Sequence, residues 1–235
     1  MARKEKLMNL LVEAAKREKE FVNTLTAGER AASGTSDNWS AKDLIAHCAF
    51  WKQRRVAEIP QVLQGGTPIL FDDFDHENDR IFQEHCDLSW EEVMALSYSA
   101  LHLLIMQLQG MSEADLNHPW QDDRPIWRTV VGNGYSHPMT HMAEHYQQKG
   151  DMARADELTV LLRQPLAELD ASPDWQGTVK YNTACRLSLL GEKEAAIAEL
   201  RDALALMPAL VEWSQQDSDL DPLREEAAFQ ALYED

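Results

Sequence analysis

The stretch WSAKDLIAHCAFW, residues 39–51, decides the fold. It opens with Ser40 followed three residues later by Asp43, a pair typical of a capped helix N-terminus. Leu44 and His47 then fall on one face at helical spacing. The stretch predicts an amphipathic helix that runs to about residue 62 and turns its histidine toward the core.

Segments with the same three- and four-residue spacing of apolar side chains lie on both sides of this helix. A long acidic connection follows Gly65 and Gly66, and a connection of that length allows a crossover between helices of a bundle. Prolines, glycines and tryptophans between 111 and 134 predict a packed loop with aromatic anchors. No run of alternating β-branched residues predicts a strand. The expected fold of residues 1–150 is an all-α four-helix bundle with helices over about 4–26, 40–62, 89–110 and 137–150, and a short piece over 78–85.

The pattern changes after Gly150, where a second, smaller helical domain over 151–235 is expected. A helix over about 151–168 precedes a helical pair with a turn at Gly191. Small residues and a terminating proline recur at the offsets of a tetratricopeptide unit: Ala184, Gly191, Ala196, Leu200, Ala203 and Pro208. A capping helix is expected in the tail over 217–235.

Charge and composition narrow the classes of partner. The formal net charge is −18 over 235 residues, which disfavours nucleic acid as a partner. The three cysteines are odd in number and far apart, as expected of reduced thiols. No signal peptide and no apolar run long enough to span a membrane are recognised. The expected compartment is the cytoplasm, with no membrane association.

Three of the eight histidines lie within nine residues: His137, His141 and His145. Side chains four apart on a helix share a face, so either His137 with His141 or His141 with His145 can chelate one ion. His47 is the candidate third ligand. Three imidazoles with open positions form a catalytic type of divalent site. The alternative is that these histidines are core residues with hydrogen-bond partners.

Nearby groups are assigned structural roles. Asp43 is expected to be a helix cap and Cys48 to pack against a helix. Glu144 is expected to be solvated, with the orientation of a ligating histidine as its alternative role. The remaining histidines are also expected to be solvated: His76, His85, His102 and His118.

Two motifs resemble the DinB-like superfamily: Trp39-Ser40-x-Lys42-Asp43-Leu44-Ile45-Ala46-His47-x3-Trp51, and Gly132-Asn133-x-Tyr135-x-His137-x3-His141. The resemblance covers roughly residues 4–149 and looks closest to the ClbS/DfsB branch. It implies a four-helix bundle with metal ligands His47, His137 and His141, and His145 as the alternate. Met142-Ala143-Glu144 follow, in place of the Arg-Gly-Gln of many thiol-transferase members.

The resemblance implies a metal-dependent hydrolase or thiol transferase that acts on a small electrophilic or toxic molecule. Its cofactor would be a divalent metal, Zn or Ni, with a low-molecular-weight thiol as a further candidate. The alternative is a non-enzymatic adaptor, in which the tetratricopeptide-like region binds a protein partner. That alternative requires an exposed apolar groove near Tyr181, Leu200 and Trp213.

Overall fold

The computed structural model describes residues 2–71, 73–121 and 123–234, and it divides into two compact units. Unit 1 is Met1–His145 and unit 2 is Tyr146–Asp235. The division falls inside helix α8, His137–Gln148. The boundary expected from the sequence, after residue 150, lies just beyond this helix.

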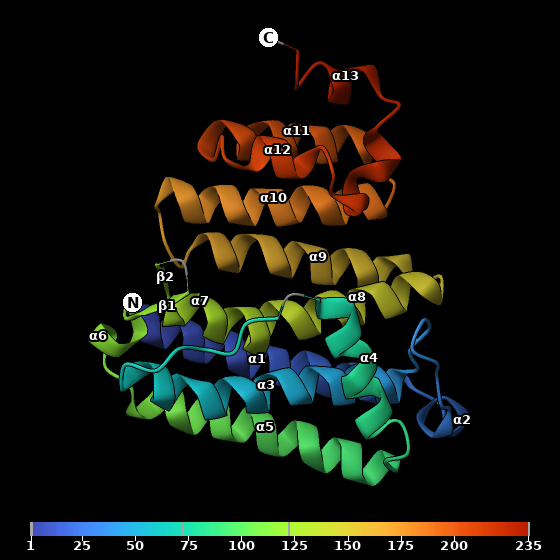
Figure 1. The fold of residues 1–235 in the computed structure, drawn as a ribbon. Helices are drawn as coiled ribbons and strands as arrows, with labels where there is room; N and C mark the ends of the chain where they lie inside the picture. The colour runs from blue at the N-terminus through green and yellow to red at the C-terminus, as the bar shows by residue number, and fades with distance from the viewer. Residues whose placement is uncertain (1, 72, 122, 235) are drawn as a thin grey trace. The chain divides into compact units, whose positions relative to one another are not determined.

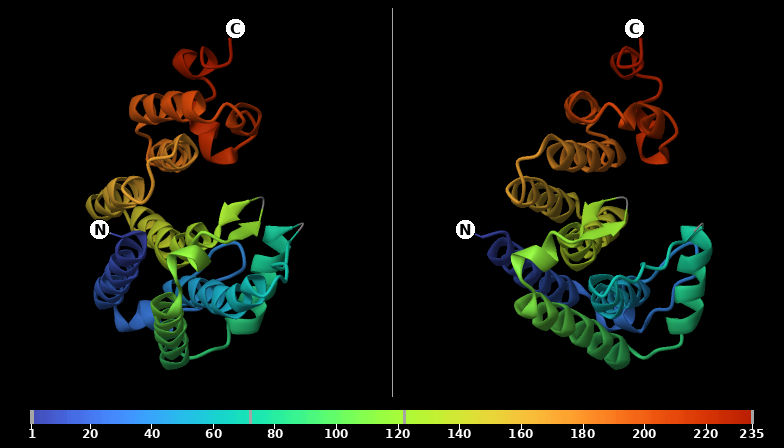
Figure 2. Two further views of the ribbon diagram at one scale, coloured as in Figure 1. Left: turned by 90° about the vertical axis from the view of Figure 1, so that its left-hand side faces the viewer. Right: turned by 60° about the vertical axis from the view of Figure 1, so that its left-hand side comes forward.

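Unit 1 is a bundle of four long helical segments, which confirms the predicted all-α class (Figure 1). The first three are α1 (Arg3–Thr24), α3 (Ala41–Leu63) and α5 (Trp90–Gly110). The fourth runs from α7 (Ile126–Val131) into α8. The turned views of Figure 2 show α1 in blue, α3 in cyan and α5 in green packed together.

Helices α3 and α5 run in the same direction, as the predicted crossover requires. Lys42 near the start of α3 donates through Nζ to the carbonyl of Leu88, 2.9 Å away, just before α5. Further along both helices, Gln107 Nε2 donates to the carbonyl of Val56 at 3.0 Å. The connection between them carries α4 (Phe74–His85) and returns the chain across the bundle (Figure 1).

Capping boxes fix several helix starts of unit 1. In each, the hydroxyl of the cap residue accepts from the backbone N–H of the third helical residue, and the side chain of that third residue accepts from the backbone N–H of the cap residue. Two backbone N–H groups that have no partner within the helix are thereby satisfied. They open α2 (Ala27–Ala31), α3, α5 and α6 (Glu113–Leu116), through the pairs Thr26/Glu29, Ser40/Asp43, Ser89/Glu92 and Ser112/Asp115.

The fourth long α-helix, α8, begins at His137 as expected, but it continues a helical segment that starts at Ile126 and was not expected. A π-helical turn, Gly132–Ser136, joins α7 to α8 without a break. The glycines of this turn do not end the helix. A Cβ at Gly134 would overlap the side chain of Leu11, so glycine here allows close packing against α1.

The expected absence of strands is wrong, by one small hairpin. β1 (Pro119–Gln121) pairs antiparallel with β2 (Arg124–Pro125) within the predicted loop. Asp123 has φ of +59°, a left-handed conformation that Asp tolerates in tight turns. A strand this short has no alternating pattern from which to predict it.

Among the described residues, α5 is the one helix whose length and composition would suffice to cross a membrane, and a third of its most apolar window is buried. Val93, Ala100 and Leu104 are fully buried on its inner face. The inner face of this helix is therefore part of the bundle core.

Unit 2 is built on a helical pair. α10 (Pro173–Leu189) and α11 (Lys193–Leu206) pack closely across a turn in which Gly191 has φ of +81°. Ala184, Ala196 and Leu200 are fully buried in their shared core. The assignment of this pair to the tetratricopeptide class stays a prediction.

The other elements of unit 2 precede and follow that pair. They are α9 (Met152–Ala167), α12 (Leu210–Ser214), the 3-10 helix Ser218–Leu223 and α13 (Ala227–Gln230). The single capping helix expected over 217–235 is wrong, since two short pieces stand there and Pro222 lies inside the first. Pro222 has no backbone N–H to continue a ladder of helical bonds.

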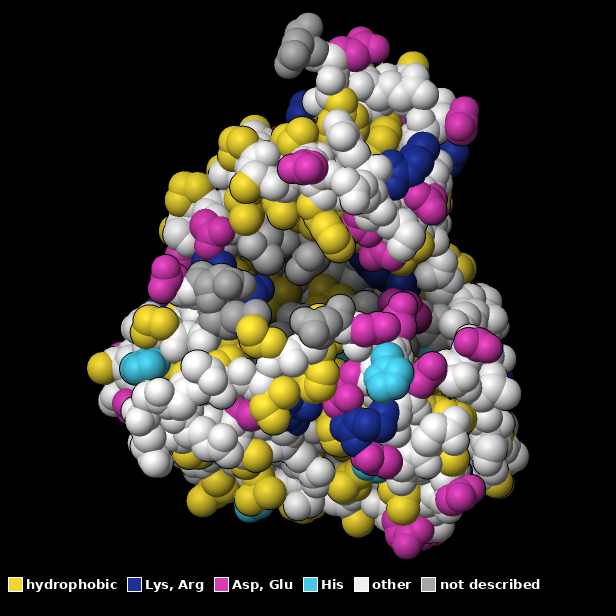
Figure 3. All heavy atoms as spheres, viewed as in Figure 1, with side chains coloured by type: hydrophobic (Ala, Val, Ile, Leu, Met, Phe, Trp, Pro, Cys, Tyr) yellow, Lys and Arg dark blue, Asp and Glu magenta, His cyan; other side chains and the backbone are white. Residues whose placement is uncertain are grey.

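Acidic side chains dominate the charged surface. On the face shown in Figure 3, Asp and Glu side chains are spread among neutral and hydrophobic ones, while Lys and Arg occur in small groups. This distribution agrees with the net charge of −18.

Candidate metal centre

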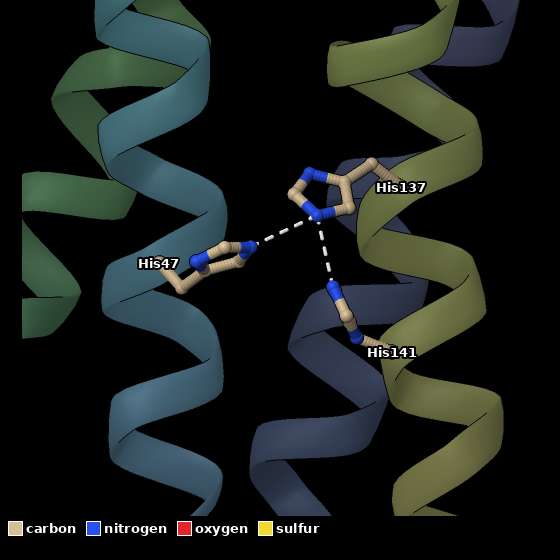
Figure 4. A group of neighbouring side chains, drawn as sticks. All are labelled: His47, His137 and His141. Carbon is tan, nitrogen blue, oxygen red and sulfur yellow. Dashed lines mark hydrogen bonds between the residues drawn. The ribbon is translucent and has the colours of Figure 1, made fainter. Parts of the chain in front are cut away.

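Three imidazoles from two helices of unit 1 converge on one point (Figure 4). His47 projects from α3, and His137 and His141 project from α8. The Nε2 atom of His137 lies 3.0 Å from that of His47 and 2.8 Å from that of His141. All three donor atoms lie within 4.8 Å of one another. The residues predicted as ligands are therefore brought together.

The spacing of these nitrogens suits a metal ion. Two imidazole nitrogens at about 2.0–2.1 Å from one ion, at angles of about 90–110°, are roughly 2.9–3.4 Å apart. The separations of 3.0 and 2.8 Å lie at the short end of this range and just below it. A neutral imidazole has one N–H, so His137 Nε2 makes at most one good hydrogen bond with these two neighbours. The cluster could hold a divalent metal.

Local structure places each ligand. His137 and His141 are one helical turn apart on α8, immediately after the π-turn. His47 lies one turn beyond the capped start of α3, where Asp43 Oδ2 accepts from the backbone N–H of Ser40 at 2.9 Å and of Gly34 at 2.8 Å. These bonds fix the first turn of α3 and hence the direction in which His47 points.

Burial keeps two of the imidazoles neutral. The pKa of His47 is lowered to about 3, first by burial and then by the neighbouring His141 and His85. Burial, together with His141 and His47, holds the pKa of His137 well below its ordinary value. At neutral pH these rings carry lone pairs instead of charge, which is the form that binds a metal.

Glu144 orients one ligand, so the expectation that it is solvated is incomplete. His141 Nδ1 lies 2.8 Å from Glu144 Oε2, and the Nδ1–H donates to the carboxylate. The other nitrogen, Nε2, is thereby left as the lone-pair donor. A carboxylate that accepts from a histidine in this way fixes the tautomer of a ligand. The sequence contained this signal as the three-residue spacing on α8.

His145, the alternate ligand, lies outside the group. Its ring packs edge-on against Phe21 of α1, with centroids 5.1 Å apart, and it is buried. His137 with His141 is therefore the pair that faces His47.

Of the other four histidines, His85 and His118 are half-buried, although they are expected to be solvated. His85 is the one of the two that comes close to His47, whose pKa it helps to lower. It is half-buried at the end of α4, and its Nδ1 donates to the carbonyl of Ile81 at 2.7 Å. His102 is exposed and stacks on Tyr98.

An indole covers one side of the cluster. The ring of Trp39 lies 4.3 Å from that of His47 and 5.8 Å from that of His141, between centroids. Trp51 meets His47 edge-on at 6.3 Å. These rings form part of the wall of the site.

A buried ion pair next to the cluster was not expected. Lys52 is 1% exposed, and its Nζ lies 3.4 Å from Glu18 Oε2. Ser97 Oγ donates to the other oxygen of Glu18 at 2.6 Å. The positive charge of Lys52 contributes to the lowered pKa of His137. No helical spacing links the three residues, because each comes from a different helix.

The adaptor alternative requires an exposed apolar groove near Tyr181, Leu200 and Trp213. Tyr181 and Leu200 are buried in the core of unit 2 and do not line such a groove, while Trp213 is 60% exposed.

Unit 2 also brings Cys185 close to Asp217 and Asp219. Burial, followed by the nearby carboxylates, raises the pKa of the Cys185 thiol, so the thiolate that would bind a metal is disfavoured.

The comparisons with known proteins give one match. A family model described as the DinB superfamily matches residues 10–149, which includes all three converging histidines. Comparison with curated proteins and with solved structures gives no match.

Proposed function

We propose that this chain, which belongs to the DinB superfamily, is a metal-dependent enzyme acting on a small electrophilic molecule through a centre formed by His47, His137 and His141. The observation that carries the proposal is the convergence of three Nε2 atoms within 4.8 Å. Three neutral protein ligands leave positions for a water or a substrate. A divalent ion held this way, Zn or Ni, supplies an activated water or thiol at neutral pH.

The surrounding side chains support this assignment. Glu144 holds His141 with Nε2 directed at its partners, and burial keeps His47 and His137 unprotonated. Both features maintain lone pairs where a cation needs them. Trp39 packs against the rings of His47 and His141 and forms part of the wall of the site.

The nucleophile is proposed to be water in preference to a free thiol. Met142 and Ala143, which follow His141, are both buried and apolar. They offer no charged group to the carboxylate of a low-molecular-weight thiol. Hydrolysis of activated esters and conjugation of a thiol to an electrophile, each assayed with added zinc and with added nickel, separate the two chemistries.

Metal binding itself is tested with His141→Ala. Protein purified without a nickel column and stripped with chelator is titrated with zinc against a chromophoric competitor. We expect one ion per chain for the wild type and loss of stoichiometric binding for the variant, since two ligands compete poorly with water. His102→Ala is the matched control, because His102 is an exposed histidine distant in sequence from the cluster, and it should bind as the wild type does.

Thermal melting gives an independent readout. Chelator should lower the midpoint of the metal-loaded wild type and leave that of His141→Ala unmoved, because a ligand bound only by the folded state stabilises it. A wild-type midpoint indifferent to both chelator and added metal would show that the histidines are structural.

A further inference from the structure

A small cavity lies beside His47, one of the three candidate ligands. It has a volume of about 10 Å³ and is lined by residues of α3, by residues at the end of α4 and Cys86 after it, and by Trp39. Asp43, His47 and His85 contribute to its walls. A volume of about 10–15 Å³ holds one water molecule.

Three polar atoms of the lining residues are buried without a hydrogen-bond partner among the described residues. They are Trp39 Nε1, Asp43 Oδ1 and His47 Nδ1. Asp43 and His47 are 5% and 4% exposed, so bulk water does not serve these groups. A buried polar group left unpaired costs about 1–3 kcal/mol, and three around one cavity identify a site that binds a polar atom.

The donors and acceptors of the lining match a single water. The indole N–H of Trp39 can only donate, and a carboxylate oxygen of Asp43 can only accept. His85 donates through Nδ1 to the carbonyl of Ile81, which leaves its Nε2 as an acceptor. A water that accepts from two donors and donates to two acceptors has four partners, at the upper end of what buried waters make.

Asp43 is free to take this second role because its cap uses the other oxygen. Oδ2 accepts from the Ser40 N–H and hydroxyl and from the Gly34 N–H, at 2.7–2.9 Å. Oδ1 takes no part in these bonds.

We propose that this cavity binds a water that links His47 Nδ1–H to Asp43 Oδ1, so that Asp43 is a positioning residue for His47. The link keeps the proton of His47 on Nδ1 and its lone pair on Nε2, toward His137 and His141. It does for His47 what Glu144 does directly for His141. The proposal rests on the proposed metal function only where affinity is concerned, because the tautomer of His47 exists without any ion.

The test is Asp43→Asn, compared with Ser40→Ala. The amide oxygen of Asn can replace Oδ2 in the cap while its NH₂ group replaces Oδ1, so an acceptor at the cavity becomes a donor. Ser40→Ala weakens the same cap and leaves Oδ1 unchanged. Histidine ¹⁵N shifts of the metal-free protein report the tautomer of His47 at neutral pH. We expect the Nδ1–H form in the wild type and in Ser40→Ala, and a shift toward the Nε2–H form in Asp43→Asn.

Zinc affinity provides the second readout. Loss of a partner that orients a ligand typically weakens metal binding by about 10–100-fold. We expect a loss of that size for Asp43→Asn, and a change of about twofold or less for Ser40→Ala. If Asp43→Asn does not fold, the tautomer of the wild type still decides the question. An Nε2–H form of His47 in the metal-free wild type would overturn the proposal, as would unchanged tautomer and affinity in a folded Asp43→Asn. A wild type with no affinity for zinc would overturn the proposed function and leave the tautomer test standing.

Discussion

Acid should destabilise the metal-free protein through His47 and His137. The pKa of His47 is about 3 in the folded chain against 6.5 for an ordinary histidine, and that of His137 is also well below 6.5. The unfolded chain therefore binds more protons than the folded one between about pH 6.5 and pH 3, and stability falls as the pH is lowered through this window.

The magnitude follows from the unfolded state. A histidine with a pKa of 6.5 when unfolded that stays neutral at pH 5.5 when folded loses roughly 1 kcal/mol of stabilisation between pH 7.5 and 5.5. The two buried histidines together give a loss of roughly 2–3 kcal/mol. Replacing His47 by Gln should remove about half of this pH-dependent loss, since His137 remains buried and keeps its share.

The assay is urea unfolding in the presence of chelator at the two pH values, followed by tryptophan fluorescence. Ser40→Ala is the control, because loss of a cap lowers stability by about 1 kcal/mol and removes no titratable group. Its loss between pH 7.5 and 5.5 should equal that of the wild type. Equal losses for the wild type and His47→Gln would refute the claim that His47 is buried in its neutral form.

Two further predictions concern packing and thiol chemistry. Gly134→Ala should destabilise unit 1 by about 1–2 kcal/mol in thermal melts, because the cost of overpacking, about 1–3 kcal/mol, outweighs the gain in helix propensity. Gly132→Ala is the matched control in the same π-turn. Its methyl group meets open space, so this variant should be as stable as the wild type or more stable. Burial raises the pKa of Cys48 to about 12 and also raises the pKa of Cys185. A thiol reagent at pH 8 should therefore modify one thiol of the folded chain, that of the half-buried Cys86, and should modify all three after urea is added. Rapid labelling of Cys48 in the folded chain would contradict the burial described here.

Local signals carried most of what the sequence could predict. The Ser40 and Asp43 cap lies within three residues, and the position of His47 one turn later follows from helical geometry alone. For the same reason, His137 and His141 were recognisable as a chelating pair on one helix. Contacts between residues a few positions apart do not depend on how the bundle closes.

The choice between His137 and His145 was of a different kind, because both are one turn from His141. It depends on the rotation of α8 about its own axis relative to its neighbours. In the structure, Phe21 of α1 packs against the His145 ring and α3 meets His137 and His141. A single sequence has no local feature that reports such a rotation.

The π-turn at Gly132–Ser136 supplies the physical reason for that rotation. A π-helical turn adds one residue to the helical repeat, which offsets the faces of the helices on either side by about 100°. On a regular α-helix Trp127, Val130, His137 and His141 would share one stripe, because they follow one another at steps of three, seven and four residues. The extra residue of the π-turn offsets the two pairs, so that α7 buries Trp127 and Val130 while α8, continuous with it, directs His137 toward His47. The glycine-rich segment that reads as a loop in the sequence therefore sets the direction of the histidines, in agreement with the frequent occurrence of π-turns at functional sites.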